Sequence, residues 1–274
     1  MSLASSVADL LRSAAGIETH AFTSAIIVAA GSSTRMAGAG SKQMLELDGM
    51  PVIARTLRTF NNSPRIDEII VVAKPDELDE YPRLAELYGL NKIAAVVPGG
   101  QTRADSVLRG FRKINEKAKY VAIHDGARCL VTDAVIDAVW QKAYRHGAAI
   151  AATRAIDTIK LADEHGFAAE TLDRSLIWQA QTPQIFATKV YTAAVYTAVE
   201  ADELSTATDD CALAERIGYK VKLVECGRDN IKITTPDDLS RAEAILAARR
   251  EASAYRAPEK PAKQANGSEQ EGDA

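Results

Sequence analysis

Short apolar runs alternate along the chain with segments whose apolar residues recur at helical spacing. The continuous runs are AIIVAA (25–30), EIIVVA (68–73), IAAVV (93–97), YVAIH (120–124) and AAIAA (148–152). Continuous runs of this kind are typical of strands buried on both faces of a sheet. Between two of them, segment 102–114 places Val107, Phe111 and Ile114 on one helical face. The alternation predicts an α/β fold with a mostly parallel sheet and right-handed crossovers.

Polar residues at the ends of these segments mark where the helices begin and stop. Thr102 with Asp105 predicts a capped helix start, and Thr132 with Gly147 brackets a second helix. Later in the chain, segments 188–201 and 208–218 return to helix, whereas 220–226 and 230–235 are predicted to be strands. Thr235 followed by Pro236 predicts the start of a last helix.

The alternation fails between residues 155 and 186. Polar and apolar residues interchange there around EHG (164–166) with no helical face, which favours a projecting hairpin. We therefore expect one α/β domain, 24–250, that carries an arm at about 154–178. Residues 1–23 form an N-terminal extension, and the Pro-, Lys- and Glu-rich segment 251–274 is expected to be disordered.

Composition narrows the class of protein. The net charge of −4 gives no long-range attraction for a polyanion, so we expect no nucleic-acid partner. Cys129, Cys211 and Cys226 are odd in number and lack metal-site spacing, which favours reduced thiols in the cytoplasm. The first 23 residues lack the pattern of a signal peptide or a membrane span. We expect a protein with no membrane contact.

The first apolar run ends in small residues, followed by a loop with two cations. Ala29, Ala30 and Gly31 place bare backbone amides at the carboxyl edge of the sheet, where α/β folds bind ligands. The loop matches neither the dinucleotide fingerprint nor the P-loop spacing. Arg35 and Lys42 would supply the fixed charge that a triphosphate needs. The alternative is an ordinary strand-to-helix turn with two solvated cations.

Three further segments bring polar groups to the same edge. PGGQTRADSV (98–107) puts Gly100 between a strand and a capped helix, and HDGARC (124–129) adds Asp125 and Arg128. Asp125 would hold Mg²⁺ or a substrate hydroxyl, or else form an ordinary loop salt bridge. Lys232 is predicted on a short strand whose apolar neighbours point the other way, a pattern that also fits a solvated face.

Taken in order, these segments resemble the 2-C-methyl-D-erythritol 4-phosphate cytidylyltransferases. The resemblance runs from about residue 25 to 245 and rests on AAGSSTRM, SKQ, GGQTRADSV, HDGAR, DTIK, DRSLIWQAQTPQIF, TDD and DNIKITTPDDL. It implies a Rossmann-like three-layer nucleotidyltransferase fold and a homodimer with interlocking arms. It also implies that CTP and methylerythritol 4-phosphate are joined with release of pyrophosphate, in non-mevalonate isoprenoid biosynthesis.

The resemblance also assigns roles to residues. Those implied to hold the cytidine are Ala29, Ala30, Gly31, Gly100 and Ser106. Arg35 and Lys42 would grip the triphosphate, with Lys232 as a third catalytic cation. The implied binding set for methylerythritol phosphate consists of Asp125, Arg128, Thr158, Lys232 and, less directly, Asp229, with Arg174 from the partner subunit. Thr208 and Asp209 also match a family stretch, although a role as helix caps explains them equally well.

The implied chemistry is governed by charge. A phosphate dianion attacks a phosphate that is itself negative, so Mg²⁺, bound mainly through the CTP phosphates, and several cations must cancel the repulsion. No protein nucleophile, general base or dedicated protein metal site is expected. The sequence departs from the family pattern at Ser33, Thr102, Gly126 and Cys129, where glycine, an acid, alanine and proline are usual. These departures bear on substrate affinity more than on reaction type.

Three rival functions follow from the same residues. The nearest is a ribitol-5-phosphate cytidylyltransferase, from a sister family that shares the fold. A nicotinamide oxidoreductase would need the glycine fingerprint and an acid after the second strand, where the sequence has Lys74 first. A nucleotide-binding protein without catalysis would not need the cations Arg35, Lys42, Arg128 and Lys232.

Overall fold

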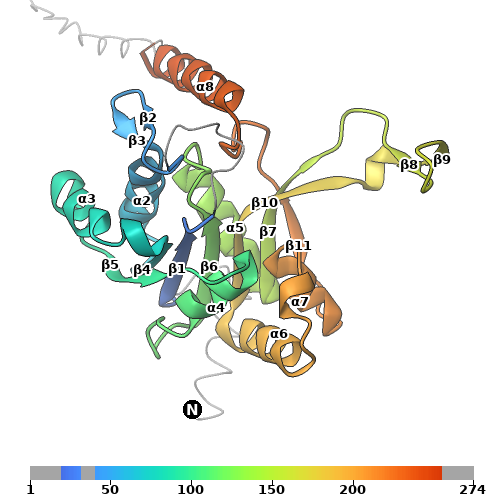
Figure 1. Ribbon diagram of the computed structural model, residues 1–274, viewed down its shortest axis with the longest axis horizontal. Helices are drawn as coiled ribbons and strands as arrows, with labels where there is room; N and C mark the ends of the chain where they lie inside the picture. The colour runs from blue at the N-terminus through green and yellow to red at the C-terminus, as the bar shows by residue number, and fades with distance from the viewer. Residues whose placement is uncertain (1–19, 32–40, 255–274) are drawn as a thin grey trace, which may run out of the picture.

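A single central sheet organises the molecule. The computed structural model describes residues 20–31 and 41–254, and within these ranges seven strands lie in the order β11-β7-β10-β6-β1-β4-β5 (Figure 1). Their bounds are β1 (Thr23–Val28), β4 (Glu68–Ala73), β5 (Ile93–Pro98), β6 (Tyr120–Asp125), β7 (Ala148–Arg154), β10 (Trp178–Ala187) and β11 (Lys222–Glu225). Only β10, among these strands, is antiparallel to its neighbours, β6 and β7. The predicted α/β fold with a mostly parallel sheet is confirmed.

Helices cover both faces of this sheet, which makes three layers (Figure 1). One face carries α2 (Val52–Asn62), α3 (Glu80–Tyr88) and α5 (Asp133–His146), and the other carries α4 (Arg103–Phe111), α6 (Thr188–Glu200) and α7 (Asp210–Arg216). Alternate strand residues point to opposite faces. Ile27 therefore packs in the first core cluster and Ile26 in the second. Two buried faces explain why the strand sequences are apolar throughout.

The predicted helix caps are present. Thr102 and Asp105 form a reciprocal capping box at the start of α4, and the Thr132 hydroxyl accepts from the backbone amide of Val135. Gly147 ends α5 in the left-handed conformation, with a φ of 81°. Asp209 caps α7 by accepting from the amide of Ala212 at 3.0 Å. These contacts fix how each helix leaves the edge of the sheet.

The last helix, α8 (Pro236–Ala254), begins at the predicted proline. The Asp238 carboxylate accepts hydrogen bonds from the backbone amides of Thr234 and Thr235, each at 2.8 Å. The helix lies beside the short antiparallel pair β2 (Glu46–Leu47) and β3 (Met50–Pro51), which the sequence pattern did not predict. Single-turn helices also occur at η2 (Pro75–Glu77) and η4 (Leu204–Thr206).

The interrupted segment after β7 forms an arm, as predicted. It consists of β8 (Lys160–Ala162), paired antiparallel with β9 (Ala168–Thr171), and η3 (Arg174–Leu176), and it projects away from the sheet (Figure 1). At its root, the Ala155 amide donates to the carbonyl of Ile177 at 3.0 Å. The Arg154 guanidinium stacks over the Trp178 ring at 4.3 Å. The root of the arm is therefore fixed to the edge of the domain.

The predicted strand at 230–235 is wrong. This segment is irregular, and its alternating apolar residues meet a different surface: Ile233 is fully buried in a cluster with Leu47 and Ala242 of α8. The backbone amide of Ile233 donates to the carbonyl of Ala127 at 2.8 Å. A period-two alternation of apolar and polar residues indicates only that one side of an extended segment is buried. Here α8 covers that side, and the segment forms no strand hydrogen bonds within the described part of the chain.

Two other expectations concern compartment and membrane contact. In the described part of the chain, no helix has the length and apolarity needed to cross a membrane. Cys129, Cys211 and Cys226 are all free. The expectations about residues 1–19 and 255–274 concern segments outside the described residues.

Candidate active site

A cavity of about 500 Å³ opens at the carboxyl edge of the central strands. Among the described residues that line it are seven that the sequence predicted: Ala30, Gly31, Lys42, Gly100, Ser106, Asp125 and Lys232. They come from the segments at the ends of β1, β5 and β6, from the first turns of α4, from the segment before β2, and from the irregular segment before α8. The edge of the sheet brings them together because parallel strands end on the same side.

The glycine loop after β5 forms one wall. The Gly100 amide donates to the Ser106 hydroxyl oxygen at 3.0 Å, and that hydroxyl donates to the carbonyl of Thr102 at 2.9 Å. A Cβ on residue 100 would lie only 2.3 Å from the Cβ of Asp105. Only glycine therefore allows the loop to lie so close to the first turn of α4. Ser106 is 3% exposed, and its hydroxyl fixes the shape of this wall.

Three cations surround the carboxylate of Asp125 at the end of β6. Its oxygens lie 2.9 Å from Lys232 Nζ, 3.2 Å from Arg103 Nε and 3.7 Å from Arg128 Nε. Burial alone would raise the pKa of Asp125, but Arg103, Lys232 and Arg128 outweigh it and hold the pKa well below its usual range. The carboxylate stays ionised, and the cluster carries a surplus of positive charge beside the cavity.

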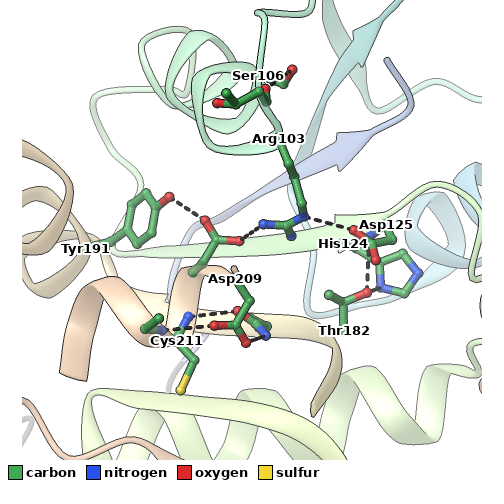
Figure 2. Close-up of polar contacts among 12 residues, drawn as sticks. Arg103, Ser106, His124, Asp125, Thr182, Tyr191, Asp209 and Cys211 are labelled. Atoms are coloured by element: carbon green, nitrogen blue, oxygen red, sulfur yellow. Dashed lines mark hydrogen bonds and ion pairs between the residues drawn. The ribbon is translucent and has the colours of Figure 1, made fainter. Parts of the chain in front are cut away.

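Arg103 is a charged residue of the site that the sequence analysis did not assign to it. Its Nε contacts Asp125 (Figure 2), and its Nη1 lies 2.7 Å from Oδ2 of Asp210, so the guanidinium bridges β6 and α7. Burial would lower the pKa of Arg103, but the two carboxylates raise it above its ordinary value. Its Nη2 is buried and has no hydrogen-bond partner among the described residues. The available signal was its place as the first residue of a capped helix after two glycines.

Lys42 also lines the cavity and is only 9% exposed. Its neighbour Gln43 accepts, through its backbone carbonyl, from the amide of Ile53 at 2.9 Å, which ties this segment to the start of α2. The side chain of Gln43 is 2% exposed and also lines the cavity. A lysine placed in this way keeps its ammonium near the cavity as a fixed charge.

The remaining predicted residues lie elsewhere. Arg35 is outside the described residues. Ala29 is buried beneath the cavity, where its amide donates to the carbonyl of Val72 at 2.7 Å. Arg128 stands behind Asp125 and donates to the carbonyl of Asn230 at 2.8 Å. Asp229 lies beside a second hollow, with Oδ2 at 3.7 Å from Arg249 Nη2.

Thr158 and Arg174 lie on the arm, away from the cavity of their own chain. Arg174 Nη1 donates to the carbonyl of Ile156 at 2.7 Å, so the two sides of the arm are joined beside Thr158. Within one chain, neither residue is among the described residues that line the cavity.

The described side chains at the cavity include few of the groups that bind a metal ion. Among residues 20–31 and 41–254, no group of three or more His, Cys, Asp or Glu side chains is placed to hold a metal ion. Asp125 is the one carboxylate among the described cavity-lining residues, and cations surround it. Such a site suits Mg²⁺ that is carried mainly by substrate phosphates, which is how Mg²⁺ is commonly bound.

Comparison with known proteins identifies the family. The model of the 2-C-methyl-D-erythritol 4-phosphate cytidylyltransferase family matches residues 23–248. The enzyme of that name from Syntrophus aciditrophicus (strain SB) is 44% identical over 223 residues, covering 81% of this chain and 94% of its own length. The one from Geobacillus thermodenitrificans (strain NG80-2) is 42% identical over 225 residues, with coverages of 82% and 97%.

Solved structures agree with the sequence relatives. The crystal structure of 4-diphosphocytidyl-2C-methyl-D-erythritol synthase from Anaerococcus prevotii DSM 20548 superposes with a TM-score of 0.74 at 31% identity, covering 83% of this chain and 97% of that one. The 2-C-methyl-D-erythritol 4-phosphate cytidylyltransferase of Thermus thermophilus gives a TM-score of 0.68 at 30% identity, with coverages of 82% and 99%. The chain therefore belongs to the 2-C-methyl-D-erythritol 4-phosphate cytidylyltransferase family and is a nucleotidyltransferase.

Proposed function

We propose that this protein transfers CMP from CTP to 2-C-methyl-D-erythritol 4-phosphate, with release of pyrophosphate. The observation that supports it best is the union of two features in one cavity: a glycine-lined wall and a carboxylate surrounded by three cations. The wall suits close approach of a nucleotide, and the cation surplus suits two phosphate-bearing substrates. Family membership supplies the identity of those substrates.

In the proposed reaction, Lys42 and Arg35 hold the triphosphate and stabilise the charge that develops at its α-phosphorus. The floor around Ala29, Ala30 and Gly31, with Gly100 and Ser106, holds the cytidine. Lys232 and Asp125 orient methylerythritol phosphate, with Arg128 beside Asp125, and Asp229 is assigned to the substrate hydroxyls. The attacking phosphate oxygen displaces pyrophosphate in line, so the chain supplies position and charge, and no protein nucleophile.

Mg²⁺ would enter this site with CTP. When bound, it neutralises part of the phosphate charge during attack. The chain contributes Lys42, Arg103 and Lys232 around the cavity, and these cations share that task. Asp125 is the only carboxylate among the described residues that line the cavity, and cations already contact both of its oxygens, so Mg²⁺ would be held mainly by the CTP phosphates.

The arm supports a homodimer in this proposal. Ile156, Leu161, Phe167 and Leu176 are 53%, 52%, 71% and 75% exposed, and all four lie on the arm. A projecting hairpin with several bare apolar side chains is typical of a surface that is covered by a partner. We assign the arm, about 154–178 of the domain 24–250, to this contact, with Thr158 and Arg174 delivered to the partner's cavity.

The three free cysteines fit a reducing compartment, so we assign the enzyme to the cytoplasm. Burial raises the pKa of the Cys129 and Cys226 thiols to about 11. Thiols of this kind are weak nucleophiles at neutral pH, because the thiolate is the reactive form. They take no part in the proposed reaction.

A pyrophosphate-release assay with Mg²⁺ tests the function. We expect turnover with CTP and methylerythritol 4-phosphate, little with ATP in place of CTP, and little with ribitol 5-phosphate at equal concentration. Selective turnover of ribitol 5-phosphate would move the protein to the sister function. CTP binding without pyrophosphate release from either polyol phosphate would contradict a catalytic role.

A further inference from the structure

Thr182 lies where the ladder between β10 and β6 stops. The last register pair is Gln184 with Ile123, and the pairing of β10 with β7 shifts between Ala180 and Gln184. Pro183 has no amide hydrogen to donate. The backbone amide of Asp125 instead donates to the side-chain oxygen of Thr182 at 3.1 Å. A threonine hydroxyl therefore replaces a ladder contact at the residue that carries the site carboxylate.

His124 holds the other side of that hydroxyl. The ring is fully buried, with Nδ1 at 3.0 Å from Thr182 Oγ1 (Figure 2) and Nε2 at 3.2 Å from the carbonyl oxygen of Arg128. A carbonyl can only accept, so Nε2 carries the proton and Nδ1 is an acceptor. The Thr182 hydroxyl must then donate to Nδ1, which leaves its oxygen free to accept from Asp125. The donor and the acceptor of each of these three hydrogen bonds are therefore determined.

The ring is also neutral. Burial lowers the pKa of His124 to about 3, against a smaller opposing effect of Asp125. Phe60 packs on the ring with centroids 4.8 Å apart. A neutral ring held on three sides cannot easily rotate or exchange its tautomer, so it is suited to fixing geometry.

Thr182 also holds the segment that carries Lys232. Its carbonyl accepts from Asn230 Nδ2 at 2.8 Å, and the same Nδ2 donates to Gln181 Oε1 at 3.0 Å. The carbonyl of Asn230 in turn accepts from the Arg128 guanidinium at 2.8 Å. Thr182 is thus a common point for Asp125 and for two of its three cations.

We propose that Thr182 and His124 are positioning residues for the reaction: they fix the Asp125 carboxylate and, through it and Asn230, the ammonium of Lys232. Neither side chain is among the described residues that line the cavity, so their effect passes through the residues that do. The inference rests on the proposed function, because it assumes that Asp125 and Lys232 orient the methylerythritol phosphate.

Substitutions of Thr182 can separate the effect of its hydroxyl group from the effect of its side-chain shape. Thr182→Val leaves His124 Nδ1 and the Asp125 amide unpartnered, and we expect KM for methylerythritol phosphate to rise about tenfold while KM for CTP stays within about twofold. Thr182→Ser retains the hydroxyl and is expected to recover most of the lost affinity. The matched control is Thr192→Val on α6, where the hydroxyl only donates to the carbonyl of Thr188.

Unchanged KM values in Thr182→Val would overturn the proposal, and so would a Ser variant as impaired as the Val variant. The Thr182→Val variant could fail to fold, so a second measurement uses the unaltered protein. In ¹⁵N-histidine-labelled protein, the His124 ring is expected to show the Nε2–H tautomer with Nδ1 as acceptor between pH 6 and 8. An Nδ1–H tautomer or an imidazolium at pH 6 would equally overturn it.

Different results would contradict the proposed function and the positioning role of Thr182. No pyrophosphate release by the unaltered enzyme from CTP and methylerythritol phosphate would contradict the proposed function, and with it the catalytic reason for this positioning. Normal release by the unaltered enzyme, combined with an indifferent Thr182→Val variant, would contradict the positioning role alone.

Discussion

Lys232 Nζ lies 2.9 Å from Oδ2 of Asp125, which joins an irregular segment near the end of the chain to the last residue of a central strand. Both residues also line the cavity. The lysine is held by one carboxylate that it shares with Arg103 and Arg128, so the cluster keeps a net positive charge. This surplus is what two anionic substrates would meet at the sheet edge.

Lys42→Ala tests the triphosphate contact. Losing one preorganised charge contact typically costs about 2.7–4 kcal/mol of transition-state stabilisation, or roughly 10²–10³ in rate. We expect kcat in the pyrophosphate assay to fall by at least that factor, with the urea unfolding midpoint little changed. Lys117→Ala removes the same charge from the exposed loop before β6 and serves as the control. Near-normal turnover in Lys42→Ala would contradict the proposed role of Lys42 in binding the triphosphate.

Arg103→Gln tests the bridge between β6 and α7. It leaves Asp210, which is 1% exposed, without its cation, and breaking a buried pair in this way typically costs about 3–5 kcal/mol. We expect urea denaturation to show a loss of that order, and the double variant with Asp210→Asn to regain part of it.

The exposed pair Arg83–Glu80 gives the comparison for that bridge. Its side chains are 74% and 48% exposed, and exposed pairs contribute about 0–1 kcal/mol. We expect Arg83→Gln to change the free energy of unfolding only slightly. Equal effects of Arg103→Gln and Arg83→Gln would show that the bridge carries no special stability.

The buried His124 makes stability depend on pH. Burial lowers its pKa from 6.5 to about 3, so below pH 6.5 the unfolded chain binds a proton that the folded protein does not. The stability it contributes is fully present above pH 6.5 and is lost as pH falls toward 3, by about 1.4 kcal/mol per pH unit. Asp125, Arg128 and Arg103 are the charged groups that act on the ring.

His124→Asn has no titrating group at this position. We expect the stability gap between the two proteins, measured by urea denaturation, to be constant from pH 8 to 7 and to narrow as pH falls from 6 to 5. A gap that stays constant over the lower range would show that the folded ring titrates normally.

Gly126→Ala tests whether the packing around residue 126 requires glycine. A Cβ there would lie 2.7 Å from Cδ1 of Ile53 and 3.2 Å from the carbonyl oxygen of Val28. Overpacking of this kind typically costs about 1–3 kcal/mol. Ile53→Val removes the clashing methyl, so we expect the double variant to be more stable than the sum of the single losses. Strict additivity would exclude Ile53 as the cause.

Leu176→Asp tests the arm as a subunit contact. Leu176 is 75% exposed on the arm, and a buried aspartate at an apolar interface would be costly. We expect sedimentation analysis to show a dimer for the natural chain and monomers for the variant, with its circular dichroism unchanged. Leu87→Asp on α3, where leucine is 71% exposed, is the matched control. A monomeric natural chain would contradict the proposed homodimer.

The regular part of the molecule was predictable because its signals are local. The run at 68–73 is a strand over the same residues, since a sheet buried on both faces demands continuous apolar residues. Thr102 and Asp105 form the predicted capping box because both partners lie within one helical turn. The hairpin arm was visible for a related reason, as its alternation excludes a helix with one buried face.

The site was predictable only in part. Glycine and cation signals at strand ends led to Gly100, Lys42 and Asp125, because strand direction alone brings those ends to one edge. The strand predicted at 230–235 was wrong, since its period-two pattern records burial beneath α8 and not pairing with a neighbour. The local sequence pattern shows that a residue is buried, but it does not show whether a neighbouring strand or a helix buries it.

Sequence alone thus determined the layer architecture, the helix starts and most of the residues at the sheet edge, because these depend on neighbours within a few positions. Tertiary structure decided the partners. Arg103 bridges Asp125 and Asp210, and Thr182 joins Asp125 to His124, only because β6, α4, α7 and β10 converge in space. A hydrogen bond between residues far apart in the chain leaves no periodic signal in the sequence, and here such bonds hold the charges of the site.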